Sequence, residues 1–111
     1  METELWTYRG DLQDATNLEG FEVAALDGDI GKIDDATYDV GSSYIVVDTG
    51  PWIFGKKVLI PAATLVRVDL DSRKVFLMLT KDQIKDSPEL SDSMTDEDRD
   101  RVGSYYGPIY K

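Results

Sequence analysis

Apolar and β-branched residues recur along most of the chain in short runs, which glycine, proline and aspartate separate. Runs of this length and composition are typical of β-strands. An Asp-Gly pair between two such runs is a strong hairpin signal, because glycine adopts positive φ at low cost. The pattern therefore predicts a hairpin around Asp27-Gly28. The expected strands cover residues 21–26, 33–39, 44–49, 57–61, 65–71 and 74–79.

The run at 65–71 alternates cleanly between apolar and polar residues. Successive side chains of a strand point to opposite faces, so alternation separates a buried face from a solvated one. The sequence therefore predicts that the apolar and the charged positions lie on opposite faces. The first set is Val66, Val68 and Leu70, and the solvated set is Arg67, Asp69 and Asp71.

The pattern changes after Leu79. Thr80-x-x-Gln83 has the form of a capping box, which predicts a short helix from Lys81 that ends at Ser87-Pro88. Thr95-x-x-Asp98 suggests a second helix, and Gly103 is expected to end it. Short strands with frequent turns, followed by short helices, predict an all-β fold of the small barrel or sandwich type. We expect an N-terminal arm (1–17), a barrel-like domain (18–86) and an acidic, tyrosine-rich tail with a short helix (87–111).

Two strands are apolar on both faces. These are Tyr44–Val47 and Val75–Leu79, where Phe76 and Met78 point away from their apolar neighbours. A small barrel buries only its inner face, so the outer face of these strands needs cover. The candidates are the N-terminal arm (Leu5, Trp6, Tyr8), the tail (Tyr105, Tyr106, Ile109, Tyr110) or another subunit.

Composition narrows the possible chemistry. The chain of 111 residues contains no histidine and no cysteine, which removes imidazole bases, thiolate nucleophiles and the commonest metal ligands. Its net charge of −10 disfavours nucleic-acid binding through phosphates. No apolar run is long enough for a membrane span and no signal pattern begins the chain, so a cytoplasmic protein is expected. No cofactor, metal or catalytic residue is predicted.

Carboxylates supply two alternatives to a binding role. The hairpin between Asp27 and Asp35 is rich in aspartate and offers oxygen ligands to a cation or small molecule, although a calcium-loop pattern is missing. Asp69 and Asp71 share one strand face, which keeps a carboxylate-only hydrolase open as a less favoured reading.

Aromatic residues in irregular segments favour a contact role. Trp52, Ile53 and Phe54 lie in a loop between Gly50 and Gly55, where bulky apolar residues either plug the end of a barrel or form a contact patch. The tyrosines of the tail leave the same two alternatives open. The predicted interface residues are Trp52, Ile53, Phe54, Phe76, Met78, Tyr105 and Tyr106.

Several segments taken in order resemble the PRC-barrel family. They are Gly20-x-x-Val23, residues 27–35, 44–50 and 55–62, Val66-x-Val68-Asp69, and residues 79–88; the ending Tyr105-Tyr106-Gly107-Pro108 is similar to tails of stand-alone bacterial members. The resemblance covers about residues 18–88 and implies a compact, strongly bent β-barrel of five to six strands. In relatives this module is the cytoplasmic domain of the photosynthetic reaction-centre H subunit and the C-terminal domain of a ribosome maturation factor.

In both of those settings the module is an adaptor that docks on larger partners, and the family offers no catalytic motif to transfer. The sequence therefore predicts a non-catalytic binding or assembly module that docks on a protein partner or on itself, with a homodimer expected. The alternatives are the cation or small-molecule sensor and the carboxylate-only hydrolase.

Overall fold

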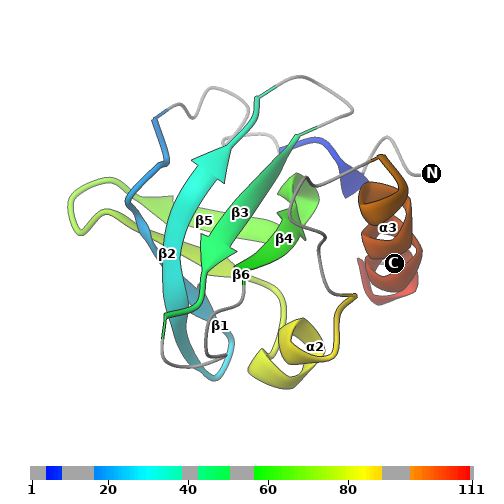
Figure 1. Cartoon of the computed structure of the whole chain (residues 1–111). Helices are drawn as coiled ribbons and strands as arrows, with labels where there is room; N and C mark the ends of the chain where they lie inside the picture. Colours follow the sequence, from blue (N-terminus) through cyan, green and yellow to red (C-terminus); the bar gives the residue numbers. More distant parts are fainter. Residues whose placement is uncertain (1–4, 9–16, 39–42, 51–56, 89–95, 111) are drawn as a thin grey trace.

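A computed structural model describes residues 5–8, 17–38, 43–50, 57–88 and 96–110 of the chain. Strands follow one another up to residue 77, and helices complete the chain (Figure 1). The elements are β1 (Glu22–Ala25), β2 (Gly28–Ala36), β3 (Tyr44–Asp48), β4 (Lys57–Pro61), the 3₁₀ turn η2 (Ala62–Thr64), β5 (Leu65–Asp69), β6 (Lys74–Leu77), α2 (Lys81–Lys85) and α3 (Asp96–Tyr110). The mostly β fold with a helix after it is confirmed.

The six strands form one mixed sheet in the order β4-β3-β2-β1-β6-β5. Neighbouring strands are antiparallel except for β1 and β6, which run parallel. The register shifts at two points of β2 and once in β5, and such bulges bend a sheet and increase its twist. The bent sheet encloses the core without closing, so β4 and β5 are its two end strands.

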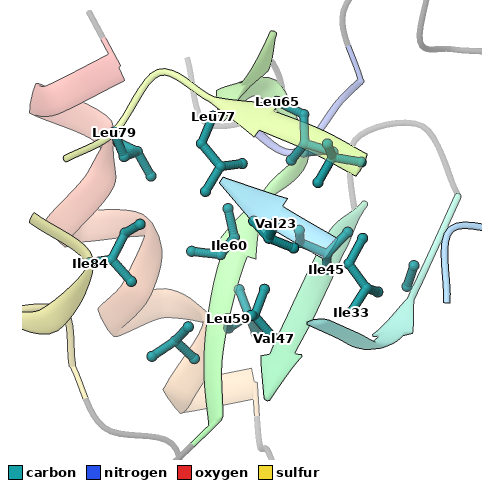
Figure 2. Packing of buried hydrophobic residues seen from close by; sticks show 14 of the residues in the cluster. Val23, Ile33, Ile45, Val47, Leu59, Ile60, Leu65, Leu77, Leu79 and Ile84 are labelled. Carbon is teal, nitrogen blue, oxygen red and sulfur yellow. The ribbon is translucent and has the colours of Figure 1, made fainter. Parts of the chain in front are cut away.

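Aliphatic side chains from all six strands meet inside this bend, and Figure 2 shows them pointing toward one another. Ile84 of α2 is fully buried and joins this cluster from the helical side. The strands differ in how much they contribute, because the central positions of β3 and β4 are buried while most of β5 is not.

The N-terminal arm packs against the outer face of β3, and α3 packs against the arm and β4. Leu5, Trp6 and Tyr8 are buried, and the Trp6 ring meets Tyr44 edge to face with centroids 6.3 Å apart. Val46, which alternates with the inward residues of β3, is 7% exposed. For Tyr44–Val47, the cover that two apolar faces require therefore comes from within the chain.

Helix α3 does not end at Gly103, so that expectation is wrong. The helix continues through Gly103 and Pro108 to Tyr110. A Cβ atom at position 103 would lie 3.3 Å from Cζ2 of Trp6, so glycine here gives the indole room against the helix. A tertiary contact with the N-terminal arm, and not helix termination, accounts for this glycine.

The capping box of α2 is confirmed. The Thr80 hydroxyl accepts a hydrogen bond from the Gln83 amide at 3.2 Å, and the Gln83 side chain accepts one from the Thr80 amide at 2.9 Å. The Lys81 amide donates to Asp27 at 2.8 Å, which ties the start of the helix to the β1–β2 turn.

Removing this cap is expected to lower stability moderately. Thr80→Ala leaves amides at the helix start without an acceptor and should cost about 1 kcal/mol of the free energy of unfolding. Thr80→Ser keeps the hydroxyl and should retain most of it. Urea unfolding followed by tryptophan fluorescence measures both; equal stability of the two variants would contradict a capping role.

Candidate functional site

Strand β5 and the turn that follows it expose apolar side chains instead of burying them. Val66 is 45% exposed and Leu70 71%, and with Leu26 they are the exposed large hydrophobic side chains of the described chain. Leu65 is the residue of β5 that is fully buried in the core. The prediction that Val66 and Leu70 lie on a buried face is therefore wrong.

A bulge at the start of β5 explains the difference for Val66, whereas Leu70 lies beyond the strand, in the turn to β6. Leu65 pairs with Leu77, and the next paired residue, Arg67, lies opposite Phe76, so Val66 is an extra residue without a partner in the ladder. A bulge of this kind redirects the side chains beside it. The sequence did contain a signal, because Leu65 and Val66 are consecutive apolar residues and a regular strand turns only one of them inward.

The outer face of the β5–β6 hairpin carries cations beside an aromatic ring. Phe76 is half-buried, and the Arg67 guanidinium lies 5.1 Å and the Lys74 ammonium 5.8 Å from its ring centroid. Lys74 also forms an ion pair with Asp29 at 2.9 Å. The negative face of an aromatic ring attracts cations, so Arg67 and Lys74 interact favourably with the partly exposed ring of Phe76.

Asp69 closes the hairpin. Its Oδ1 accepts hydrogen bonds from the amides of Asp71 at 3.1 Å and Ser72 at 3.3 Å, and its Oδ2 lies 3.9 Å from the Arg67 guanidinium. The hydrogen bonds from Ser72, helped by Asp71 and Arg67, hold the pKa of Asp69 below its ordinary value. One strand thus presents a fixed anion and a cation two residues apart. We call Val66, Arg67, Asp69, Leu70 and Phe76 the β5 surface.

The residues predicted as an interface lie in different environments. Phe76 belongs to the β5 surface, and Met78 is half-buried against the core. Tyr105 donates a hydrogen bond to the Gln83 carbonyl at 2.5 Å and so holds α3 to α2, and Tyr106 is completely buried and offers a partner no surface. Trp52, Ile53 and Phe54 lie outside the described residues.

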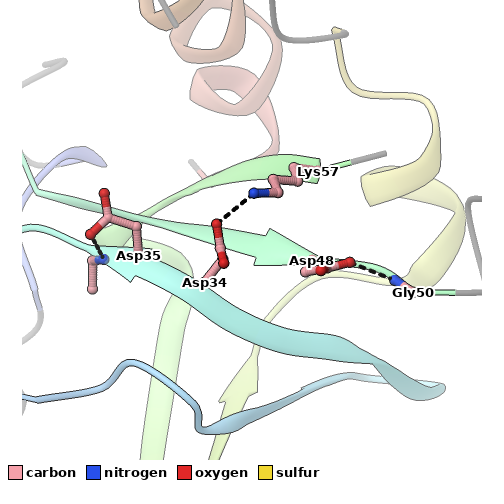
Figure 3. A network of polar contacts seen from close by, with 6 residues as sticks. Asp34, Asp35, Asp48, Gly50 and Lys57 are labelled. Carbon is pink, nitrogen blue, oxygen red and sulfur yellow. Dashed lines mark hydrogen bonds and ion pairs between the residues drawn. The ribbon is translucent and has the colours of Figure 1, made fainter. Parts of the chain in front are cut away.

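The aspartates of the predicted sensor hairpin do not converge. Asp34 pairs with Lys57 at 2.7 Å, while Asp35 accepts a hydrogen bond from the Ala36 amide at 2.9 Å (Figure 3). Asp27 and Asp29 have the separate partners given above. Over the described ranges, no three acidic side chains come together in a way that could hold a metal ion.

The part of the chain that forms the sheet is similar to a known domain family. The family model for the PRC-barrel domain matches residues 11–84. This chain belongs to the PRC-barrel family. The match contains all six strands and most of α2, so the β5 surface lies within the PRC-barrel domain and α3 follows it.

An uncharacterized protein of Deinococcus radiodurans is similar to this PRC-barrel chain, with 40% identity over 77 residues. The similar region is 66% of this chain and 27% of that protein, so the chain spans only part of the length of its relative. Neither helix of the described chain is long and apolar enough to cross a bilayer.

Proposed function

We propose that this PRC-barrel chain is a non-catalytic module that binds a protein through the β5 surface. The observation that carries the proposal is the exposure of Val66 on an end strand and of Leu70 in the turn that follows it, since among the described residues the only other large aliphatic side chain exposed to this degree is Leu26. Exposed aliphatic groups beside an aromatic ring and an arginine are typical of contact surfaces between proteins.

The chemistry of the chain supports a role without catalysis. It has neither histidine nor cysteine, so a general base or nucleophile would have to come from carboxylates, lysines or hydroxyls. The carboxylates of the 27–35 hairpin are bound to separate partners, and Asp69 is committed to its turn. Membership in a family of adaptor modules agrees with this reading.

Two leucines of similar exposure provide a matched test. Leu70 lies in the β5 surface and is 71% exposed, whereas Leu26 lies in the β1–β2 turn and is 67% exposed. We expect Leu70→Lys to release a bound protein, because a buried ammonium at a contact is costly. Leu26→Lys should leave binding unchanged, because Leu26 lies outside the β5 surface. The two variants alter the net charge equally, so a difference between them cannot come from net charge.

Affinity capture from a lysate of the native cell, with quantitative mass spectrometry, measures the difference. The proposal expects at least one protein, an untagged copy of the chain included, that the wild type and Leu26→Lys retain and Leu70→Lys loses. Equal retention by all three proteins, or a wild type that retains nothing, would overturn it.

A further inference from the structure

Among the strands that the structure describes, β5 has a neighbour on one side only, because it stands at the end of the sheet beside β6. An end strand of this kind presents unpaired backbone groups to which another strand can bind. Its bulge is confined to Val66, and Arg67, Val68 and Asp69 are paired regularly with consecutive residues of β6. These three residues therefore form a regular template for an added antiparallel strand.

The sequence of this template is complementary to itself. When residues 67–69, Arg-Val-Asp, run antiparallel to the same segment of a second copy, one register centres the two-fold axis on Val68. Arg67 then lies opposite Asp69 of the other copy, and Val68 lies opposite Val68. Directly opposed residues of opposite charge, or of matching apolar character, stabilise an antiparallel pair.

Neighbouring registers lack this match. A shift of two residues places Arg67 opposite Arg67 or Asp69 opposite Asp69, and like charges directly opposite each other are destabilising. An odd shift places the inner face of one strand against the outer face of the other. The charges thus select the register centred on Val68.

Two rows of side chains cross the sheet from β1 through β6 to β5, and a second copy paired in this register would extend both rows with matching residues. Val23, Val75 and Val68 are opposite one another on β1, β6 and β5, and Val68 is half-buried at the end of this row. On the outer face a second row reads Glu22, Lys74, Asp69, with charges that alternate in sign. Val68 of a second copy would extend the first row, and Arg67 would extend the second.

We propose that two copies of this chain join β5 to β5 in antiparallel register about Val68, so that one sheet runs through both. The inference rests on the proposed binding function and names a second copy of the chain as the partner. A contact made by one strand from each copy is small, so the expected dimer is a weak one, in the range of micromolar dissociation constants. The net charge of −10 opposes association at low ionic strength, so we would measure it in about 0.15 M salt.

Charge reversal tests the register. Arg67→Asp places aspartates opposite each other twice across the axis, and we expect the dissociation constant in sedimentation equilibrium to rise at least about tenfold. The double variant Arg67→Asp, Asp69→Arg restores opposite charges and should recover the dimer, with circular dichroism confirming that each variant is folded. A folded double variant that stays as weak as Arg67→Asp would overturn the register.

Crosslinking supplies a test that does not disturb the charges. The chain has no cysteine, so Val68→Cys introduces a single thiol that the axis would place beside its own copy, with Cβ atoms about 5 Å apart. Leu70→Cys is the control, because its two thiols would lie four residues out of step, about 13 Å apart. Under mild oxidation we expect a disulfide-linked dimer from Val68→Cys and monomer from Leu70→Cys.

Two results would overturn the self-association. One is faster crosslinking of the more exposed Leu70→Cys, which indicates random collision. The other is a wild type that stays monomeric at about 100 μM, a concentration at which a dimer with a micromolar constant is well populated. If Leu70→Lys still releases a different captured protein, the binding function survives and only the identity of the partner is wrong.

Discussion

Gly31→Ala is expected to lower the free energy of unfolding by about 4 kcal/mol or more, which is a large share of the stability of an ordinary small domain. Gly31 lies in β2 with φ +150°, and a Cβ atom there would stand 2.0 Å from the Asp48 carbonyl oxygen and 2.9 Å from its carbonyl carbon. Both atoms belong to the backbone of β3. The strands can relieve this overlap only by separating where Lys32 pairs with Asp48.

Gly50→Ala is the matched control for this variant. Gly50 also has a positive φ, +54°, but a Cβ atom there would have no atom of the described residues within 4 Å outside its immediate neighbours. Its replacement should therefore cost only the backbone strain of a left-handed residue, about 1 kcal/mol. Urea unfolding gives the free energy of unfolding of both variants, and the difference between them is the cost of the steric overlap beyond the backbone strain. A Gly31→Ala protein as stable as Gly50→Ala would show that β2 and β3 do not approach so closely.

Local signals were sufficient for most of the fold. The run at 57–61 combines β-branched residues with a proline that ends the ladder, and it forms β4 with the expected bounds. The capping box at Thr80 is equally local, because all of its hydrogen bonds lie within one turn. The ordered resemblance to PRC-barrels added the connection between these elements, and the family match confirms it.

Contacts between distant segments accounted for the errors. The end of α3 was misplaced because glycine is a local helix breaker, whereas the indole that requires Gly103 belongs to the N-terminal arm. The faces of β5 were misplaced because only one of Leu65 and Val66 can point inward. In the structure Leu65 pairs with Leu77 of β6 and is the inward residue. Neither partner is near in sequence.

The candidate site was only partly foreseeable for the same reason. Phe76 was selected by its apolar character and lies in the β5 surface. Aromatic composition indicates how much energy a residue contributes to a contact but not whether that contact is internal. Tyr106 illustrates this, since the extended α3 carries it into the core.

Truncating Tyr106 is expected to have the second large effect. Its side chain is fully buried and meets Tyr105 edge to face, with centroids 4.9 Å apart. Tyr106→Ala should cost about 3–5 kcal/mol, because it removes a large apolar surface and leaves a cavity beneath α3. Tyr106→Phe keeps the ring and should be nearly neutral at pH 7, since the buried hydroxyl has no hydrogen-bond partner of good geometry among the described residues.

The pH dependence of the phenylalanine variant distinguishes a buried hydroxyl from an exposed one. Burial raises the pKa of Tyr106 above its ordinary value of 10.0, with a smaller opposing contribution from Ser87. Above pH 10 the unfolded chain therefore loses this proton while the folded chain keeps it, and the wild type is destabilised as pH rises. Tyr106→Phe lacks the group, so its stability should fall less between pH 9 and pH 11 in urea unfolding. Parallel curves for the two proteins would mean that the hydroxyl reaches solvent, and a loss well above 1 kcal/mol at pH 7 would mean that it has a partner.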